Sequence, residues 1–269
     1  MNLYTTLDAV KRAAGATGTS RDTLWMEKIL AASRRIDLFT GRAFSVVEAT
    51  RYFDGACRAE VYVDDYLAIS ALTTDSELDG TFDGETWVQN TDWVARPYNT
   101  WPKFAIELHP AGDYSFFGAR RYLKAVGSWG YGDGLRSSPW DLLSVTGTLA
   151  DASDTSLTLS AAADVEAGMT LKIESEQVYV SAVTTTTATV TRGVNGTTAA
   201  AHAAAAIYVG RYPAVVTRAC NSLAIGMMAR DKHSGYTSEQ IGAYRYTLAN
   251  DAQEDDFLAR ALNGLVRPI

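Results

Sequence analysis

The sequence predicts an α+β fold, in which a helical-bundle body carries a β-hairpin and strand region and an inserted small all-β domain. Three observations support this. Apolar residues recur at helical spacing near both ends of the chain, strand-like segments fill the middle, and from about residue 145 to 209 the composition shifts to Ala, Thr, Ser and Val. We therefore expect a body formed by residues 1–143 and 211–269, interrupted by a β-domain at residues 144–210.

Two helices are expected near the N-terminus. A capping signal at residues 5–8 begins a short helix that Gly15 ends. A longer helix covers residues 20–40 and stops at Gly41. Apolar residues line one face of this helix at helical spacing: Trp25, Ile29, Ile36 and Phe39. We expect this stripe to lie in the core or in a contact between subunits.

The middle of the chain is expected to be extended. Residues 46–53 and 59–63 flank Asp54 and Gly55, which predicts a hairpin. Further strands are expected at residues 69–74, 86–89, 104–108 and 122–129. Within the inserted domain, short strands are expected at residues 156–159, 169–173, 177–183 and 187–190, whereas the Ala-rich residues 199–206 fit either helix or loop.

Helical spacing returns after the inserted domain. Pro213 suits the first turn of a helix over residues 214–230. A final helix is expected over residues 251–262, with acidic residues near its start. Apolar pairs then recur every four residues and form a two-column stripe if the helix continues: Phe257, Leu258, Ala261, Leu262, Leu265 and Val266.

Composition narrows the classes of function. The 269 residues include 24 basic and 31 acidic ones, a net charge of −7, which disfavours a protein that grips DNA phosphates. There is no apolar run of membrane-spanning length and no secretory signal, so we expect the product to stay in the cytoplasm of the producing cell. Two cysteines are too few to staple a fold of this size.

Candidate chemistry is sparse. His109, His202 and His233 do not share the spacing of a zinc motif and fit surface or loop positions. The acidic residues of the inserted domain, including Glu174 and Glu176, fit a solvated surface. No G-x-S-x-G motif is present. We therefore expect no catalytic residues, no cofactor and no metal, and favour an interaction or structural protein over an enzyme.

Several short segments, taken in order, resemble one protein family. They are LDAVKRA at residues 7–13, SRDTL at 20–24, AASRRID at 31–37, TGRAF at 40–44, RYFDG at 51–55, VDDY at 63–66, ALTTD at 71–75 and GSWGYG at 127–132. Together with the Pro-led helix, they resemble the head–tail connector (adaptor) proteins of tailed double-stranded DNA bacteriophages. The resemblance covers about residues 1–140 and 211–269. The inserted segment, with TRGVNGTT at residues 191–198, is similar to small β-modules of phage structural proteins.

This resemblance implies a structural virion protein without catalysis or cofactor. Its copies would form a ring, usually a dodecamer, that docks beneath the portal protein in the neck, at the head–tail interface. The ring would extend the DNA channel, through which genomic DNA only passes, and would offer a platform to a stopper or tail-completion protein. Assembly would take place in the bacterial host cytoplasm. The C-terminal apolar stripe either packs back on the chain's own body or, as the resemblance implies, docks into a groove of the portal protein.

Three alternatives stay open at this point. One is another neck or tail protein, such as a stopper or minor tail protein. The second is a glycan-binding β-module on a helical carrier, and the third is an enzyme with catalytic residues scattered along the sequence.

Overall fold

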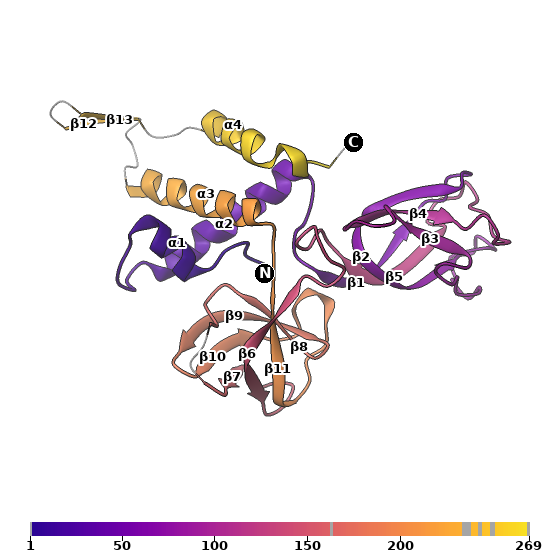
Figure 1. Cartoon of the computed structure of the whole chain (residues 1–269), viewed down its shortest axis with the longest axis horizontal. Coiled ribbons are helices and arrows are strands. Elements are labelled where there is room, and N and C mark those ends of the chain that lie inside the picture. Colours follow the sequence, from indigo (N-terminus) through magenta and orange to yellow (C-terminus); the bar gives the residue numbers. More distant parts are fainter. Residues whose placement is uncertain (1, 162–163, 233–237, 242–243, 248–250, 268–269) are drawn as a thin grey trace. The chain divides into compact units, whose positions relative to one another are not determined.

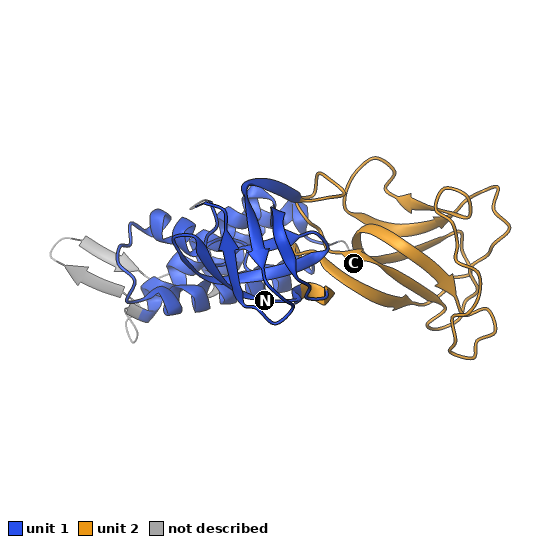
Figure 2. Cartoon of the chain, turned by 90° about the horizontal axis from the view of Figure 1, so that it is seen from below, with its two compact units in different colours: residues 1–42, 140–194, 198–269 blue, residues 43–139, 195–197 orange. Residues whose placement is uncertain are grey.

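A computed structural model describes residues 2–161, 164–232, 238–241, 244–247 and 251–267. The chain divides into two compact units (Figure 2). Unit 1 contains residues 1–42, 140–194 and 198–269, and unit 2 contains residues 43–139 and 195–197. Within the described helices, no stretch is long and apolar enough to cross a lipid bilayer.

The predicted helical-bundle α+β fold is wrong, because strand residues clearly outnumber helical ones among the described residues. They form a five-stranded sheet and a closed barrel, beside which the helices α1 to α4 are a minor part (Figure 1). The strand region that we assigned to the helical body buries a core of its own, with Tyr66, Leu72 and Trp129 inside it. It is therefore a separate compact unit and not a decoration of the helices.

The helices of unit 1 come from the two ends of the chain. Helix α1 (Leu7–Ala14) begins at Thr6, whose hydroxyl accepts a hydrogen bond from the Ala9 amide. The helix ends at Gly15, which has a φ of 62°. Helix α2 (Asp22–Thr40) ends at Gly41 in the same left-handed conformation. Helices α3 (Ala214–Lys232) and α4 (Asp251–Leu262) follow the barrel, and a 3₁₀ turn (Asn263–Leu265) continues α4. These bounds agree closely with the predicted helices.

Helix α2 packs on α3 through small and polar groups as well as apolar ones. Ser33 Oγ lies 3.4 Å from Cys220 Sγ, and both side chains are fully buried. Burial raises the pKa of Cys220 to about 11, so the thiol stays protonated at neutral pH. Between α3 and α4, a pair of short strands, β12 (Ser238–Ile241) and β13 (Tyr244–Thr247), forms an antiparallel ladder.

Unit 2 is an antiparallel sheet with the strand order β1-β5-β2-β4-β3. Its strands are β1 (Val47–Phe53), β2 (Glu60–Thr74), β3 (Trp93–Arg96), β4 (Lys103–Leu108) and β5 (Leu123–Trp129). The predicted hairpin between residues 46–53 and 59–63 is wrong, since β1 pairs with β5 instead of β2.

The reason for this pairing lies in the Asp54–Gly55 turn. The Gly55 amide donates to the Ala119 carbonyl oxygen at 2.8 Å, and the Asp54 carboxylate accepts the Arg121 amide at 2.7 Å. A Cβ atom on Gly55 would lie 1.7 Å from the carbonyl oxygen of Phe117, so only glycine permits this approach. The turn therefore joins β1 to the segment that precedes β5.

The inserted segment is a closed six-stranded barrel with the order β10-β7-β6-β11-β8-β9. Its strands are β6 (Trp140–Leu149), β7 (Ser156–Leu159), β8 (Thr170–Ile173), β9 (Glu176–Thr184), β10 (Thr187–Thr191) and β11 (His202–Gly210). The strands predicted here are confirmed, but the helix or loop expected for residues 199–206 is wrong over most of that segment, because His202–Gly210 is strand β11 and pairs with β6 and β8. Trp140 and Gly210 are cross-strand partners, so the chain enters and leaves the barrel at neighbouring positions.

Candidate functional site

The apolar stripe of α2 lies in the core of unit 1. Ile29 and Ile36 are fully buried and Trp25 is buried, whereas Phe39 is half-buried. Their burial follows from the helical period, which places these positions on the face of α2 that looks towards α3. The stripe is thus occupied by packing within one chain, with Phe39 as its most accessible member.

The predicted portal-docking stripe is divided by the packing of α4. Leu258 and Leu262 are fully buried in the chain's own body. Two ion pairs fix the helix there: Glu254 meets Arg230 at 2.5 Å and Asp255 meets Arg35 at 2.6 Å. The other four residues of the stripe remain at least partly accessible, namely Phe257, Ala261, Leu265 and Val266.

A shallow groove of about 280 Å³ runs between the start of α3 and the second half of α4. We call it the α3–α4 groove. It is lined by Val215, Arg218, Ala219, Phe257, Arg260 and Ala261. Its floor is aliphatic and aromatic, and each helix contributes one arginine. Such a groove suits one apolar side chain that carries negative charge beside it.

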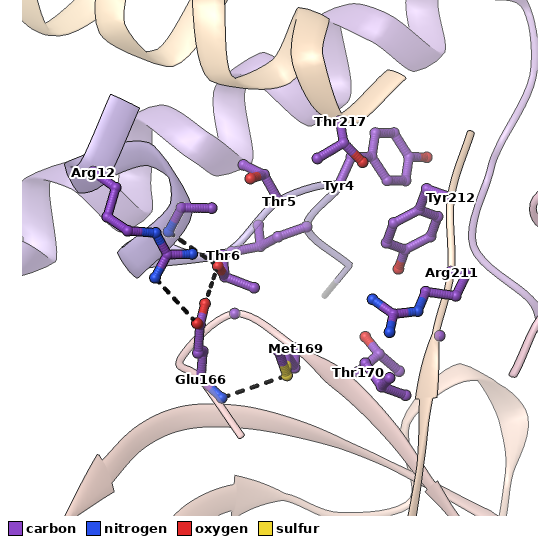
Figure 3. Close-up of a pocket in the computed structure, with 15 residues that line it drawn as sticks. Tyr4, Thr5, Thr6, Arg12, Glu166, Met169, Thr170, Arg211, Tyr212 and Thr217 are labelled. Carbon is purple, nitrogen blue, oxygen red and sulfur yellow. Dashed lines mark hydrogen bonds and ion pairs between the residues drawn. The ribbon is translucent and has the colours of Figure 1, made fainter. Parts of the chain in front are cut away.

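A second hollow, of about 320 Å³, lies where the N-terminal segment runs between the barrel and the helices (Figure 3). The segment is tied to both sides. The Thr6 hydroxyl bonds to the Glu166 carboxylate, and the Leu7 amide donates to the Ala167 carbonyl oxygen at 3.1 Å. On the helical side, the Tyr4 amide donates to Ser33 Oγ at 3.1 Å.

Both arginines that line this hollow are paired with carboxylates. Arg12 pairs with Glu166 at 3.5 Å, and Arg211 pairs with Asp141 at 2.7 Å. Burial raises the pKa of the Tyr212 phenol to about 12, so this group is neutral at physiological pH. The arrangement joins the barrel to the helices and explains why both belong to one compact unit.

The barrel contains a buried charged network that the sequence analysis misjudged. Glu176 is fully buried and accepts from Arg192 Nε at 2.7 Å, Arg192 Nη2 at 2.8 Å and His202 Nε2 at 2.8 Å. The amides of Gly193 and Ala200 donate to the same carboxylate at 3.0 Å each. The expected solvated positions of Glu176 and His202 are therefore wrong, because the closed barrel covers both.

The network has a clear electrostatic effect. Burial alone would raise the pKa of Glu176, but the hydrogen bonds from Arg192, His202 and the two amides outweigh it and hold the pKa at about 2. His202 Nδ1 also faces the exposed Glu174 carboxylate at 2.9 Å. The His202 ring therefore lies between two carboxylates. The arginine and glycine come from the TRGVNGTT segment, which could have signalled a partner for a buried acid.

The residues that were expected to carry function thus fall in three separate places, and the structure does not bring them together into one site. The α2 stripe is in the core, the C-terminal stripe is half covered, and the inserted domain is held by its own charge network. No protein-family model, no curated protein and no solved structure matches the chain.

Proposed function

We propose that this protein is a structural virion protein, a head–tail connector (adaptor) in the neck of a tailed double-stranded DNA phage. Copies of the chain form a closed ring, a dodecamer in the proposal, beneath the portal protein. The ring extends the DNA channel and gives a stopper or tail-completion protein its platform. The proposal assigns the chain no catalysed reaction and no cofactor.

The observation that carries the proposal is the way the chain is assembled. Residues 7–40 and 214–262 supply the helices of unit 1, and the sheet and the barrel formed by β1 to β11 lie between them in the sequence (Figure 1). The segments that resemble adaptors include these helices. A scaffold of this kind offers surfaces to several neighbours without needing a reaction centre.

The charge of the chain also supports this role. A net charge of −7 weakens adhesion to DNA phosphates, which suits a protein past which DNA must move. Ring formation needs two different surfaces on each copy, since a head-to-tail contact is the kind that closes into a ring.

The C-terminal end is the portal-docking segment in this proposal. Leu258 and Leu262 hold α4 on the body, so the docking role falls to the accessible part of the stripe, above all Leu265 and Val266. These two residues follow α4 and are at least partly accessible, so they can contact a partner without displacing Leu258 or Leu262 from the core.

The test is co-purification with the portal protein of the same phage, followed by mass measurement of the complex. The proposal expects a closed ring of the chain bound to the portal ring. A variant that lacks residues 264–269 is expected to lose portal binding while its Tm stays nearly unchanged, because α4 and its two ion pairs remain. A wild-type chain that never assembles, alone or with the portal protein, would overturn the proposal.

A further inference from the structure

The α3–α4 groove has an unbalanced positive charge. Arg218 is exposed and, in the part of the chain that the structure describes, has no carboxylate partner. Among the described residues, Arg260 bonds only to Asp256, one turn earlier on the same helix. Between the two arginines lies the apolar floor, where Val215 is 37% exposed. The groove is therefore suited to an apolar side chain with acidic neighbours.

Unit 2 presents a side chain of this kind on the loop after β2. Leu78 is 61% exposed, and its φ of 59° lies in the left-handed region that a leucine rarely adopts. The buried Asp75 carboxylate holds this shape, because it accepts the amides of Asp79 and Gly80 at 3.1 and 2.9 Å. Strain of this kind is kept where a segment is held ready for a contact.

Acidic residues flank Leu78 on both sides. Glu77 and Asp79 are exposed, and among the described residues neither has a cationic partner. Hydrogen bonds from Thr81 keep the pKa of Asp79 below its usual value, so its charge persists at neutral pH. The loop thus offers one aliphatic side chain between two carboxylates.

We propose that the Leu78 loop of one copy of this chain docks into the α3–α4 groove of a second copy, with Glu77 and Asp79 facing Arg218 and Arg260. Charge complementarity and the match of an aliphatic side chain to an apolar floor select this occupant. Other exposed leucines lack this match: Leu135, for example, lies between Gly134 and Arg136.

The contact joins two different surfaces and is therefore heterologous, which allows a closed ring. The inference rests on the proposed function in that it names the contact between neighbouring subunits of the ring. It also leaves Leu265 and Val266 free for the portal, since neither lines the groove.

Three variants test the contact in the full-length chain. Leu78→Ser removes the aliphatic side chain, and Ala261→Glu places a bulky carboxylate in the groove. Leu135→Ser is the matched control, because it removes another exposed leucine of unit 2, which is 77% exposed against 61% for Leu78. All three positions are at least partly accessible, so near-UV circular dichroism is expected to show native folding. Self-association is measured by sedimentation velocity and, on the portal ring, by the mass of the loaded complex.

The inference expects each of the first two variants to associate at least roughly tenfold more weakly than the wild type, with Leu135→Ser unchanged. Mixed in equal amounts, the two variants should form heterodimers but no ring, because each retains the surface that the other lacks. Arg218→Glu should weaken assembly, and adding Glu77→Lys to the same chain should restore it, because the two substitutions exchange the charges of the proposed pair. Rings that form equally well with Leu78→Ser or Ala261→Glu would overturn this contact and leave the proposed function standing. A wild-type chain that never assembles would overturn both.

Discussion

Replacing Arg192 with methionine should destabilise the barrel strongly. The Arg192 side chain is 7% exposed and the Glu176 side chain 0%, so the substitution leaves a buried carboxylate without its guanidinium. Removing one partner of a buried ion pair costs about 3–5 kcal/mol. The fall of the Glu176 pKa from 4.5 to about 2 corresponds to about 3 kcal/mol of preference for the ionised form in the fold, to which Arg192, His202 and the two amides all contribute.

Local hydrogen–deuterium exchange is the suitable assay, because a chain of two units need not unfold in one transition. Protection of the β8 and β9 amides should fall by the same free energy in Arg192→Met. In a thermal scan, a domain of this size loses roughly 4–8 °C per kcal/mol, so the barrel transition should move down by at least about 12 °C.

The network also predicts that the stability of the barrel depends on pH. The folded-state pKa of Glu176 lies below its unfolded value, so its stabilising contribution is complete above about pH 4.5 and is lost as the pH falls towards 2. Glu176→Gln should remove this dependence. Glu174→Gln is the control, because that side chain is 66% exposed and should change stability by at most about 1 kcal/mol. Barrel stability within about 1 kcal/mol of wild type in Arg192→Met would refute the reasoning.

Three further predictions concern the rest of the chain. Ile29→Asp places an unpaired charge in the core of unit 1 and should lower the free energy of unfolding by about 3–5 kcal/mol, which chemical denaturation measures. A change below about 1 kcal/mol would mean that this face of α2 is solvated. Tyr66→Phe removes a buried hydroxyl that donates to the Ala105 carbonyl oxygen at 2.8 Å and should destabilise unit 2 by about 1 kcal/mol, seen as a shift of its urea midpoint with an unchanged slope. Joining residue 140 to residue 210 through a short Gly/Ser linker should leave α1 to α4 folded, which circular dichroism measures. The expected loss of stability is about 1–2 kcal/mol, because the hydrogen bonds of Thr6 and Leu7 to the barrel are removed. Complete unfolding would mean that the barrel is an obligatory part of the helical core.

The helices could be predicted closely because their signals are local. Thr6, Gly15 and Gly41 act within one turn of the residues that they cap, and the α2 stripe repeats at a period that only a helix satisfies. The barrel strands could be located for a similar reason, since in β10 exposed Thr residues alternate with the buried Ala188 and Val190 and mark a strand with one buried face.

Strand pairing could not be predicted, because it depends on contacts far apart in the sequence. The turn at Asp54 and Gly55 has the residues of a tight hairpin. Its actual partners, Ala119 and Arg121, are more than sixty residues away, and no local pattern distinguishes them. The helical-bundle prediction failed at this point, since strands that pair across such distances build their own core instead of covering a helix.

Burial of the charged residues could not be predicted for the same reason, because it depends on contacts far apart in the sequence. Glu176 and His202 resemble surface residues when each is considered alone, because isolated charges are rarely buried. Burial of Glu176 becomes favourable only when Arg192 and two amides donate to the same carboxylate, and this arrangement depends on closure of the barrel.

Closure of the barrel also places Trp140 opposite Gly210, so the strands by which the chain enters and leaves the barrel are neighbours. The barrel is therefore inserted between unit 2 and α3 with its two chain ends adjacent, and what fixes it to the helices is the N-terminal segment, through Thr6 and Leu7. It follows that substitutions at Thr6 should loosen the attachment of the barrel to the helices while leaving the Glu176 network intact.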